Sequence, residues 1–173
     1  MEDTIVDLFF SPLACSLACR IASYEAAASA NTSTLGPVSS LDLDRLHQWL
    51  SIVGSDLHEA VSLPLVPDET GGGIGSHTRD FVIASLDFLD ERLRERQFLL
   101  DRFSSADAHL CSLLNCIPPT RIDLSAWPAI EAYHERLLKR PNVSRAIAEE
   151  LALHEAAVAR HPSFGELSFR GLL

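Results

Sequence analysis

Apolar residues recur in steps of three and four over most of this chain, a spacing typical of helices that bury one face. The clearest stripe lies between residues 41 and 61 and comprises Leu43, Leu46, Leu50, Val53, Leu57 and Val61. The opposite face of the same helix carries a narrow row of polar and small residues, namely His47, Ser51, Gly54 and His58. A row of this kind can line a cleft.

The same periodicity predicts four further helices. One spans about residues 78–96, with Val82, Leu86, Leu89 and Leu93 facing inward and charged residues such as Asp90 facing outward. The residues 104–107 form a capping box, in which the first and last side chains satisfy free backbone donors at a helix start. The helix that it opens ends before residues 118–119, and two more follow over 128–140 and 142–160.

The remaining segments do not follow this pattern. Residues 5–10 are β-branched and aromatic and predict one short strand, followed by a helix over about 14–30. Residues 63–75, rich in glycine and proline, predict a loop. We therefore expect a strand-helix unit over 1–30, a linker over 31–40, an all-α domain over 41–160 and a tail over 161–173.

Composition excludes several functions. The 173 residues carry a formal charge of −10, which disfavours binding to nucleic acid and to anionic membranes because both need clustered cations. Neither a signal peptide nor a membrane span is expected from the apolar runs, and the four cysteines are expected to be free thiols in a reducing cytoplasm. Cys15 and Cys19 lack the spacing of a zinc knuckle, so no metal site is predicted.

Two residues stand out as candidates for chemistry. Cys15 falls in the first turn of a predicted helix, where free N–H groups and the helix dipole can lower the pKa of a thiol. A buried structural thiol is an equally good interpretation from the sequence. His58 can act as a general acid or base near neutral pH, or it can interact with carbonyl groups at a helix end. Ser11 and Ser16 can hydrogen-bond a bound thiolate or carboxylate.

The order of these segments resembles a known family. Phe10, Ser11, Pro12, Cys15 and Ser16 fit the pattern aromatic, Ser or Thr, Pro, small residues, Cys, Ser. The residues 47–58, 86–108, 122–128 and 139–141 follow in the order of an all-α half with its capping box and final helical hairpin. The chain thus resembles bacterial glutathione transferases of the beta-like type, over about residues 1–28 and 41–150.

The resemblance implies a mainly α fold, a transferase C-terminal-like helical bundle of five to six helices, preceded by a β-α remnant of a thioredoxin-like domain. Residues 29–40 cannot contain the strands that hold most of the backbone of glutathione in that family. Glutathione is therefore expected to bind weakly. The lone strand needs a partner, which favours a homodimer.

The resemblance also assigns roles. It implies an enzyme that transfers, lyses or isomerises a small electrophilic metabolite, with Cys15, His58 and Ser11 as catalytic residues. Phe10, Ser16, His47 and Ser51 are expected to contact the substrate, and Cys15 is expected to be the most reactive thiol. Two alternatives stay open: a non-catalytic ligand-binding or protein-interaction module, and a glutathione-independent enzyme of specialised metabolism.

Overall fold

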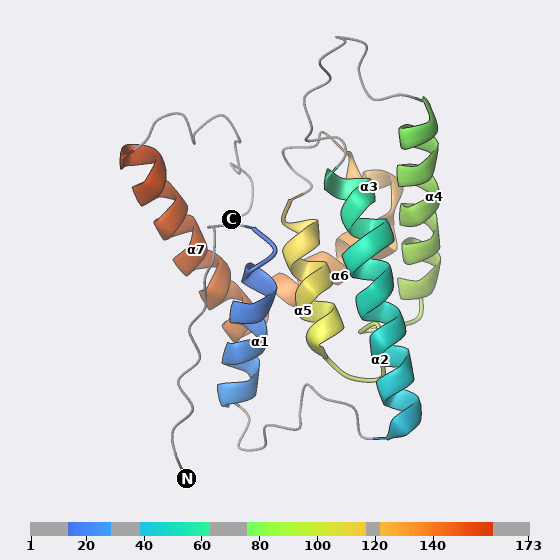
Figure 1. Ribbon diagram of the computed structural model, residues 1–173, viewed down its shortest axis with the longest axis horizontal. Helices are drawn as coiled ribbons and strands as arrows, with labels where there is room; N and C mark the ends of the chain where they lie inside the picture. Colours follow the sequence, from blue (N-terminus) through green and yellow to red (C-terminus); the bar gives the residue numbers. More distant parts are fainter. Residues whose placement is uncertain (1–13, 29–38, 63–75, 117–121, 161–173) are drawn as a thin grey trace.

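The computed structural model describes residues 14–28, 39–62, 76–116 and 122–160, and Figure 1 shows their arrangement. The elements are α1 (Leu17–Ala28), α2 (Ser40–Ile52), the π-helical turn η2 (Val53–Leu57), α3 (His58–Ser62), α4 (Ser76–Leu93), α5 (Ser105–Leu114), the 3-10 turn η5 (Leu124–Ala126), α6 (Pro128–Leu138) and α7 (Pro141–Arg160). The predicted mainly α bundle is confirmed for the described residues. The predicted strand over 5–10, the loop over 63–75, the tail and all of the linker except residues 39 and 40 lie outside them.

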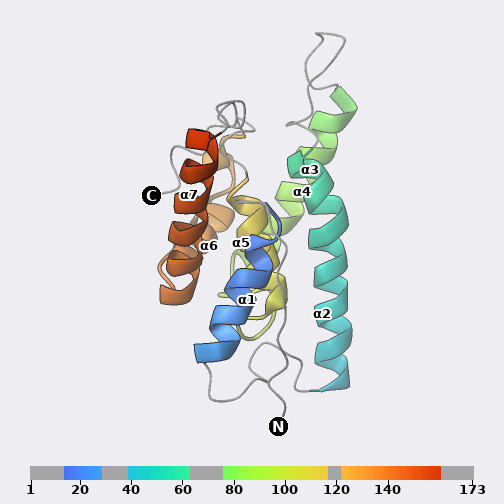
Figure 2. The ribbon, with the colours of Figure 1, turned by 60° about the vertical axis from the view of Figure 1, so that its left-hand side comes forward.

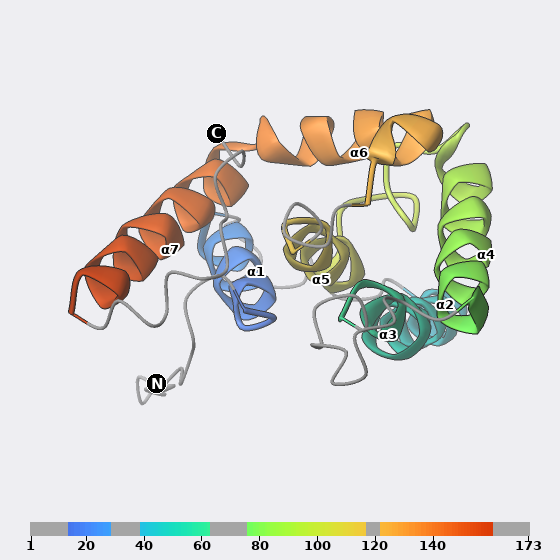
Figure 3. The same ribbon diagram turned by 90° about the horizontal axis from the view of Figure 1, so that it is seen from above.

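Helix α5 forms the centre of the bundle. Figure 3 shows it end-on, with α1, α7, α6, α4 and the α2–α3 helix around it. The predicted capping box is present at its start: Asp107, fully buried, accepts hydrogen bonds from the backbone N–H and the hydroxyl of Ser104, both at 2.8 Å. It also accepts from the backbone N–H of Leu99 at 2.9 Å and from the Tyr133 hydroxyl at 2.7 Å. One carboxylate thus joins α5, α6 and the segment before α5.

The long predicted helix over 41–61 forms, but its buried stripe differs from the predicted one. Leu43 is 38% exposed, and Trp49 takes an inward position instead, at 5% exposure. The residues that reach the core are Leu46, Trp49, Val53, Leu57 and Val61. Three successive steps of four residues would rotate a buried stripe by about 40° each in a regular α-helix. The π turn at Val53–Leu57 has wider i→i+5 hydrogen bonding in the middle of this helix. It therefore compensates part of the rotation of the buried stripe.

Asp90 was predicted to face solvent, and that prediction is wrong. The residue is 4% exposed, and its carboxylate accepts hydrogen bonds from the backbone N–H groups of Ala129 at 2.8 Å and Ile130 at 3.2 Å. These are free donors at the start of α6, which begins with Pro128. Asp90 therefore caps a helix that lies far along the chain.

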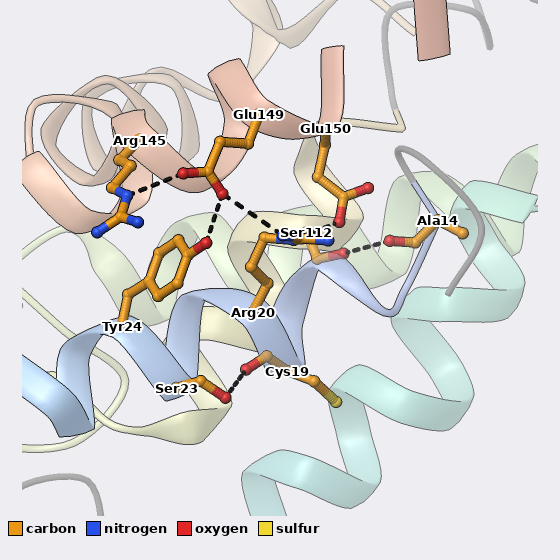
Figure 4. A network of polar contacts seen from close by, with 9 residues as sticks. All are labelled: Ala14, Cys19, Arg20, Ser23, Tyr24, Ser112, Arg145, Glu149 and Glu150. Atoms are coloured by element: carbon orange, nitrogen blue, oxygen red, sulfur yellow. Dashed lines mark hydrogen bonds and ion pairs between the residues drawn. The ribbon is translucent and has the colours of Figure 1, made fainter. Parts of the chain in front are cut away.

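Helix α1 is held on α7 by a network of charged groups (Figure 4). Arg20 donates from Nε to Oε1 of the fully buried Glu150 at 2.9 Å and lies 3.4 Å from Glu149 through Nη1. The hydroxyl of Tyr24 donates to Glu149, and Arg145 pairs with the same carboxylate at 2.9 Å. Polar groups on two helices far apart in the sequence thus satisfy one another, which fixes α1 against the bundle.

Candidate functional site

The predicted site residues fall in different parts of the structure. Phe10 and Ser11 lie outside the described residues. Cys15 and Ser16 form a turn directly before α1, in which the carbonyls of residues 14–16 accept the first backbone bonds, from Leu17, Ala18 and Cys19 at 3.0–3.1 Å. The Ser112 hydroxyl of α5 donates to the carbonyl oxygen of Ala14 at 3.3 Å. The start of α1 is therefore anchored on the C-terminal part of α5.

Of the two interpretations of Cys15 that the sequence left open, its pKa favours the buried thiol. Its side chain is half-buried, and this burial raises the pKa of the thiol above its ordinary value, outweighing the effect of a hydrogen bond with its own backbone. The charge of Cys15 in turn raises the pKa of Cys116, although burial is the larger cause of its rise to about 11. Cys15 is thus a protonated thiol at neutral pH, suited to donating an S–H hydrogen bond.

His58 lies at the start of α3, immediately after the π turn, and it is half-buried. It lies within electrostatic range of a second histidine, His109 of α5, whose pKa is lowered by burial and then by the charge of His58. A Cβ placed on Gly54 in the π turn would meet Cε1 of His109 at 3.4 Å, which is ordinary van der Waals contact. The π turn therefore lies directly against the imidazole of His109, with His58 nearby.

The sequence pattern gives no sign that His109 lies near His58, apart from the small residue Gly54 on the polar face of the preceding helix. His47 and Ser51 occupy that same face of α2, and both are exposed. No contact among the described residues joins either of them to Cys15.

The starts of α1 and α3 lie at the same end of the bundle, on opposite flanks of α5 (Figures 1 and 2). Cys15 and His58 therefore share one end, and His109 lies on the helix between their elements. Within the described ranges, no group of three or more His, Cys, Asp or Glu side chains is placed to hold a metal ion. The chemistry that this end can perform is proton exchange and hydrogen bonding to a sulfur or oxygen atom.

A second site, which the sequence analysis missed, lies elsewhere on the bundle. A cavity of about 670 Å³ opens between α2, α4 and the segment leading into α5. We call it the arginine pocket, because its lining includes four arginines, Arg45, Arg92, Arg96 and Arg102. The sequence signal was Arg92 with Arg96, a like-charge pair four residues apart that destabilises a helix unless something else neutralises it.

The wall of the arginine pocket is aromatic. Trp49 and Phe88 stack with ring centroids 6.0 Å apart, and the guanidinium carbon of Arg92 lies 5.4 Å from the centroid of Trp49. Phe88 is 53% exposed, an unusual state for a phenylalanine beside a charged pocket.

None of the described helices combines the length and apolar character needed to cross a membrane.

The helical part of the chain is similar to known proteins. Residues 57–141 match the family model described as "Glutathione S-transferase, C-terminal domain". Glutathione S-transferase GstA of Escherichia coli O157:H7 is 26% identical over 117 residues, which cover 67% of this chain and 58% of that protein. The match therefore spans less than two thirds of this curated relative.

Solved structures share the fold. A sphingomonad glutathione S-transferase complexed with glutathione superposes with a TM-score of 0.71 at 26% identity, covering 84% of this chain and 98% of that chain. The beta-class enzyme of Sphingomonas chungbukensis gives 0.69 at 25% identity, with 84% and 98% coverage. A ternary complex of BphK, a bacterial transferase, gives 0.72 at 21% identity, covering 84% and 99%. These matches agree with the order of helices α2 to α7.

Proposed function

The chain belongs to the glutathione S-transferase family, and on that premise we propose that it binds a thiol compound beside Cys15 and acts on a small electrophilic metabolite. Its fold and family support a glutathione-transferase-like function. The proposal rests above all on the position of Cys15, in a turn that α5 anchors at the end of the bundle where α3 begins. The sphingomonad relative is known as a complex with glutathione, which makes glutathione the first ligand to test.

The raised pKa of Cys15 decides its role in this proposal. A protonated thiol is a poor nucleophile but can donate a hydrogen bond to a ligand sulfur. Bound glutathione would supply the nucleophilic thiol. The S–H group of Cys15 would donate a hydrogen bond to the glutathione sulfur and so stabilise that sulfur as a thiolate. His58 would take up or return a proton near neutral pH. His109, neutral because of its lowered pKa, would be placed to accept or donate one hydrogen bond beside His58.

We propose that Ser11 assists Cys15 and that Phe10, Ser16, His47 and Ser51 contact the substrate. We also propose the division into a strand-helix unit over 1–30, a linker over 31–40, an all-α domain over 41–160 and a tail. A homodimer would supply a partner for the unit at 1–30.

Glutathione binding is expected to be weak. Helix α1 ends at Ala28 and α2 begins at Ser40, which leaves no room between them for the strands that carry most ligand contacts in the resembling family. Each lost hydrogen bond to a charged group costs about 1.5–3 kcal/mol. Two such losses weaken binding by about a hundredfold or more.

The test is calorimetry with glutathione on the wild type, Cys15→Ala and the matched control Cys19→Ala, followed by turnover of a dinitrohalobenzene. Cys19 lies four residues further on, in the first turn of α1, and is exposed. We expect millimolar binding that Cys15→Ala abolishes and Cys19→Ala leaves intact. Equal binding by all three proteins would contradict the role of Cys15.

The raised pKa of Cys15 also favours a second candidate, a non-catalytic binding module, because it leaves the protein without a thiolate of its own there. Absence of turnover, together with retained glutathione binding in the wild type, would favour this module over the enzyme.

A further inference from the structure

The arginine pocket combines an excess of positive charge with an aromatic wall. Four arginines line it against two aspartates, Asp42 and Asp101, although the chain as a whole carries a formal charge of −10. An ion pair joins Arg96 and Asp101 at 3.9 Å, and the Asp101 side chain is 87% exposed. An ion pair that is this long and this exposed neutralises little charge.

Arg92 lies at the centre of this charge and is poorly satisfied. Its Nε is buried without a hydrogen-bond partner, and its Nη2 reaches only the carbonyl oxygen of Leu99, at 3.4 Å. Burial, and then the charges of Arg96 and Arg45, lower the pKa of Arg92, while Asp101 acts in the opposite direction. The guanidinium groups of Arg45 on α2 and of Arg96, just after α4, are therefore close enough to repel that of Arg92 on α4.

A buried charged donor without a partner is costly, and mutual repulsion adds to the cost. An anion in the cavity would remove both penalties at once, because planar guanidinium groups match the oxygens of phosphate and carboxylate. Several converging arginines favour a doubly charged ligand, and a phosphate monoester carries about −1.5 to −2 at pH 7.

The aromatic wall narrows the ligand further. The exposed ring of Phe88, stacked on Trp49, offers an apolar face beside the arginines. A bare inorganic anion would leave that face uncovered, whereas an aromatic ring covers it and gains stacking energy. The volume of about 670 Å³ is in the range of small-molecule sites.

We propose that the arginine pocket binds a small aromatic anion of the phosphate-monoester type, with the charged group against Arg45, Arg92 and Arg96 and the ring against Phe88. This site is separate from the end of the bundle that carries Cys15, and it does not depend on the proposed transferase activity.

The probes are phenyl phosphate, inorganic phosphate and phenol, titrated by calorimetry into the full chain in chloride buffer at low ionic strength. We expect saturable binding of phenyl phosphate, weaker binding of inorganic phosphate and none of phenol. Arg92→Gln should weaken phenyl phosphate by at least about tenfold, because it removes a charged donor. Arg94→Gln is the matched control two residues away, directly after α4, since Arg94 is 62% exposed and pairs with Glu91 at 2.9 Å.

Two further measurements test the proposal. Arg45→Gln changes an exposed side chain on α2 and should also weaken binding, even if Arg92→Gln fails to fold. In a Trp127→Phe background, the fluorescence of Trp49 should change with phenyl phosphate at the same midpoint as the calorimetric signal.

Several results would overturn this assignment. If phenyl phosphate binds equally well to the wild type, Arg92→Gln and Arg45→Gln, it does not bind in the arginine pocket. Equal affinities for inorganic phosphate and phenyl phosphate would show that the aromatic ring contributes nothing to binding. Sedimentation that shows a dimer dissociating in Arg92→Gln or Arg45→Gln would mean that a second copy of the chain occupies the pocket instead.

Discussion

The most direct quantitative prediction concerns the pH dependence of stability and the histidine His134. Its Nε2 lies 2.9 Å from Oδ1 of Asn115, and the two atoms form a hydrogen bond when the imidazole carries its proton on Nε2. Burial lowers the pKa of His134 from 6.5 to about 4, with the charge of Glu135 opposing. A neutral histidine is therefore part of the junction between α5 and α6.

The sign follows from proton counting. Between pH 6.5 and about 4 the unfolded chain binds a proton on this histidine and the folded chain does not. The contribution is fully present above pH 6.5 and is lost as the pH falls toward 4. At about 1.36 kcal/mol per pH unit, the difference between 6.5 and about 4 amounts to about 3 kcal/mol.

The assay is urea unfolding at closely spaced pH values from 4 to 8, for the wild type and His134→Gln. Subtracting the two curves cancels the carboxylates that titrate over the same range. The wild type should lose about 3 kcal/mol more than the variant between pH 7 and pH 4. His47→Gln, which changes an exposed histidine, should track the wild type. Parallel curves for wild type and His134→Gln would refute the reasoning, as would an imidazole NMR titration of His134 near pH 6.5.

Other predictions follow from buried polar groups and thiols. Glu150→Ala removes the fully buried partner of Arg20 and leaves it the longer contact with Glu149 at 3.4 Å, so it should lower the free energy of unfolding by about 3–5 kcal/mol, measured by urea titration; a loss below about 1 kcal/mol would show that the pair is solvated. Asp107→Ala orphans four donors and should cost a similar amount, about 3–5 kcal/mol, with Asp107→Asn intermediate in thermal unfolding. Limiting iodoacetamide should label the exposed Cys19 before the half-buried Cys15, as read by peptide mass mapping; faster labelling of Cys15 would mean that its thiolate is more accessible than its burial indicates.

The helices could be predicted from the sequence because their apolar stripes and capping signals are local. Pro128 at the first position of α6 and the capping box at α5 each mark a boundary within a few residues. Asp90 could not be predicted, because its partners lie some 40 residues away, at the start of α6. A charge on an otherwise polar helix face gives no sign that a distant helix end will need it.

The candidate site was predicted in part for a related reason. Position alone places Cys15 at a helix start, but its pKa depends on how closely α5 covers it, and burial reverses the expected direction. The approach of the π turn to His109 brings His58 into its electrostatic range, and the spacing of apolar residues indicates only a continuous helix there. Tertiary packing decides both features, so neither could be derived from one element of sequence.

The two candidate sites can be tested independently because of where they lie on the same long helix. Arg45 precedes His58 by thirteen positions along α2, η2 and α3, which corresponds to about 20 Å at 1.5 Å per residue. That separation exceeds the screening length of about 8 Å at physiological ionic strength, so a charge change at Arg45 has little direct effect at His58. Distant sites without shared partners usually respond additively. A double variant of Arg45→Gln and Cys15→Ala should therefore lose both ligands by the same factors as the single variants, and a departure from additivity would reveal that α2 transmits a change between them.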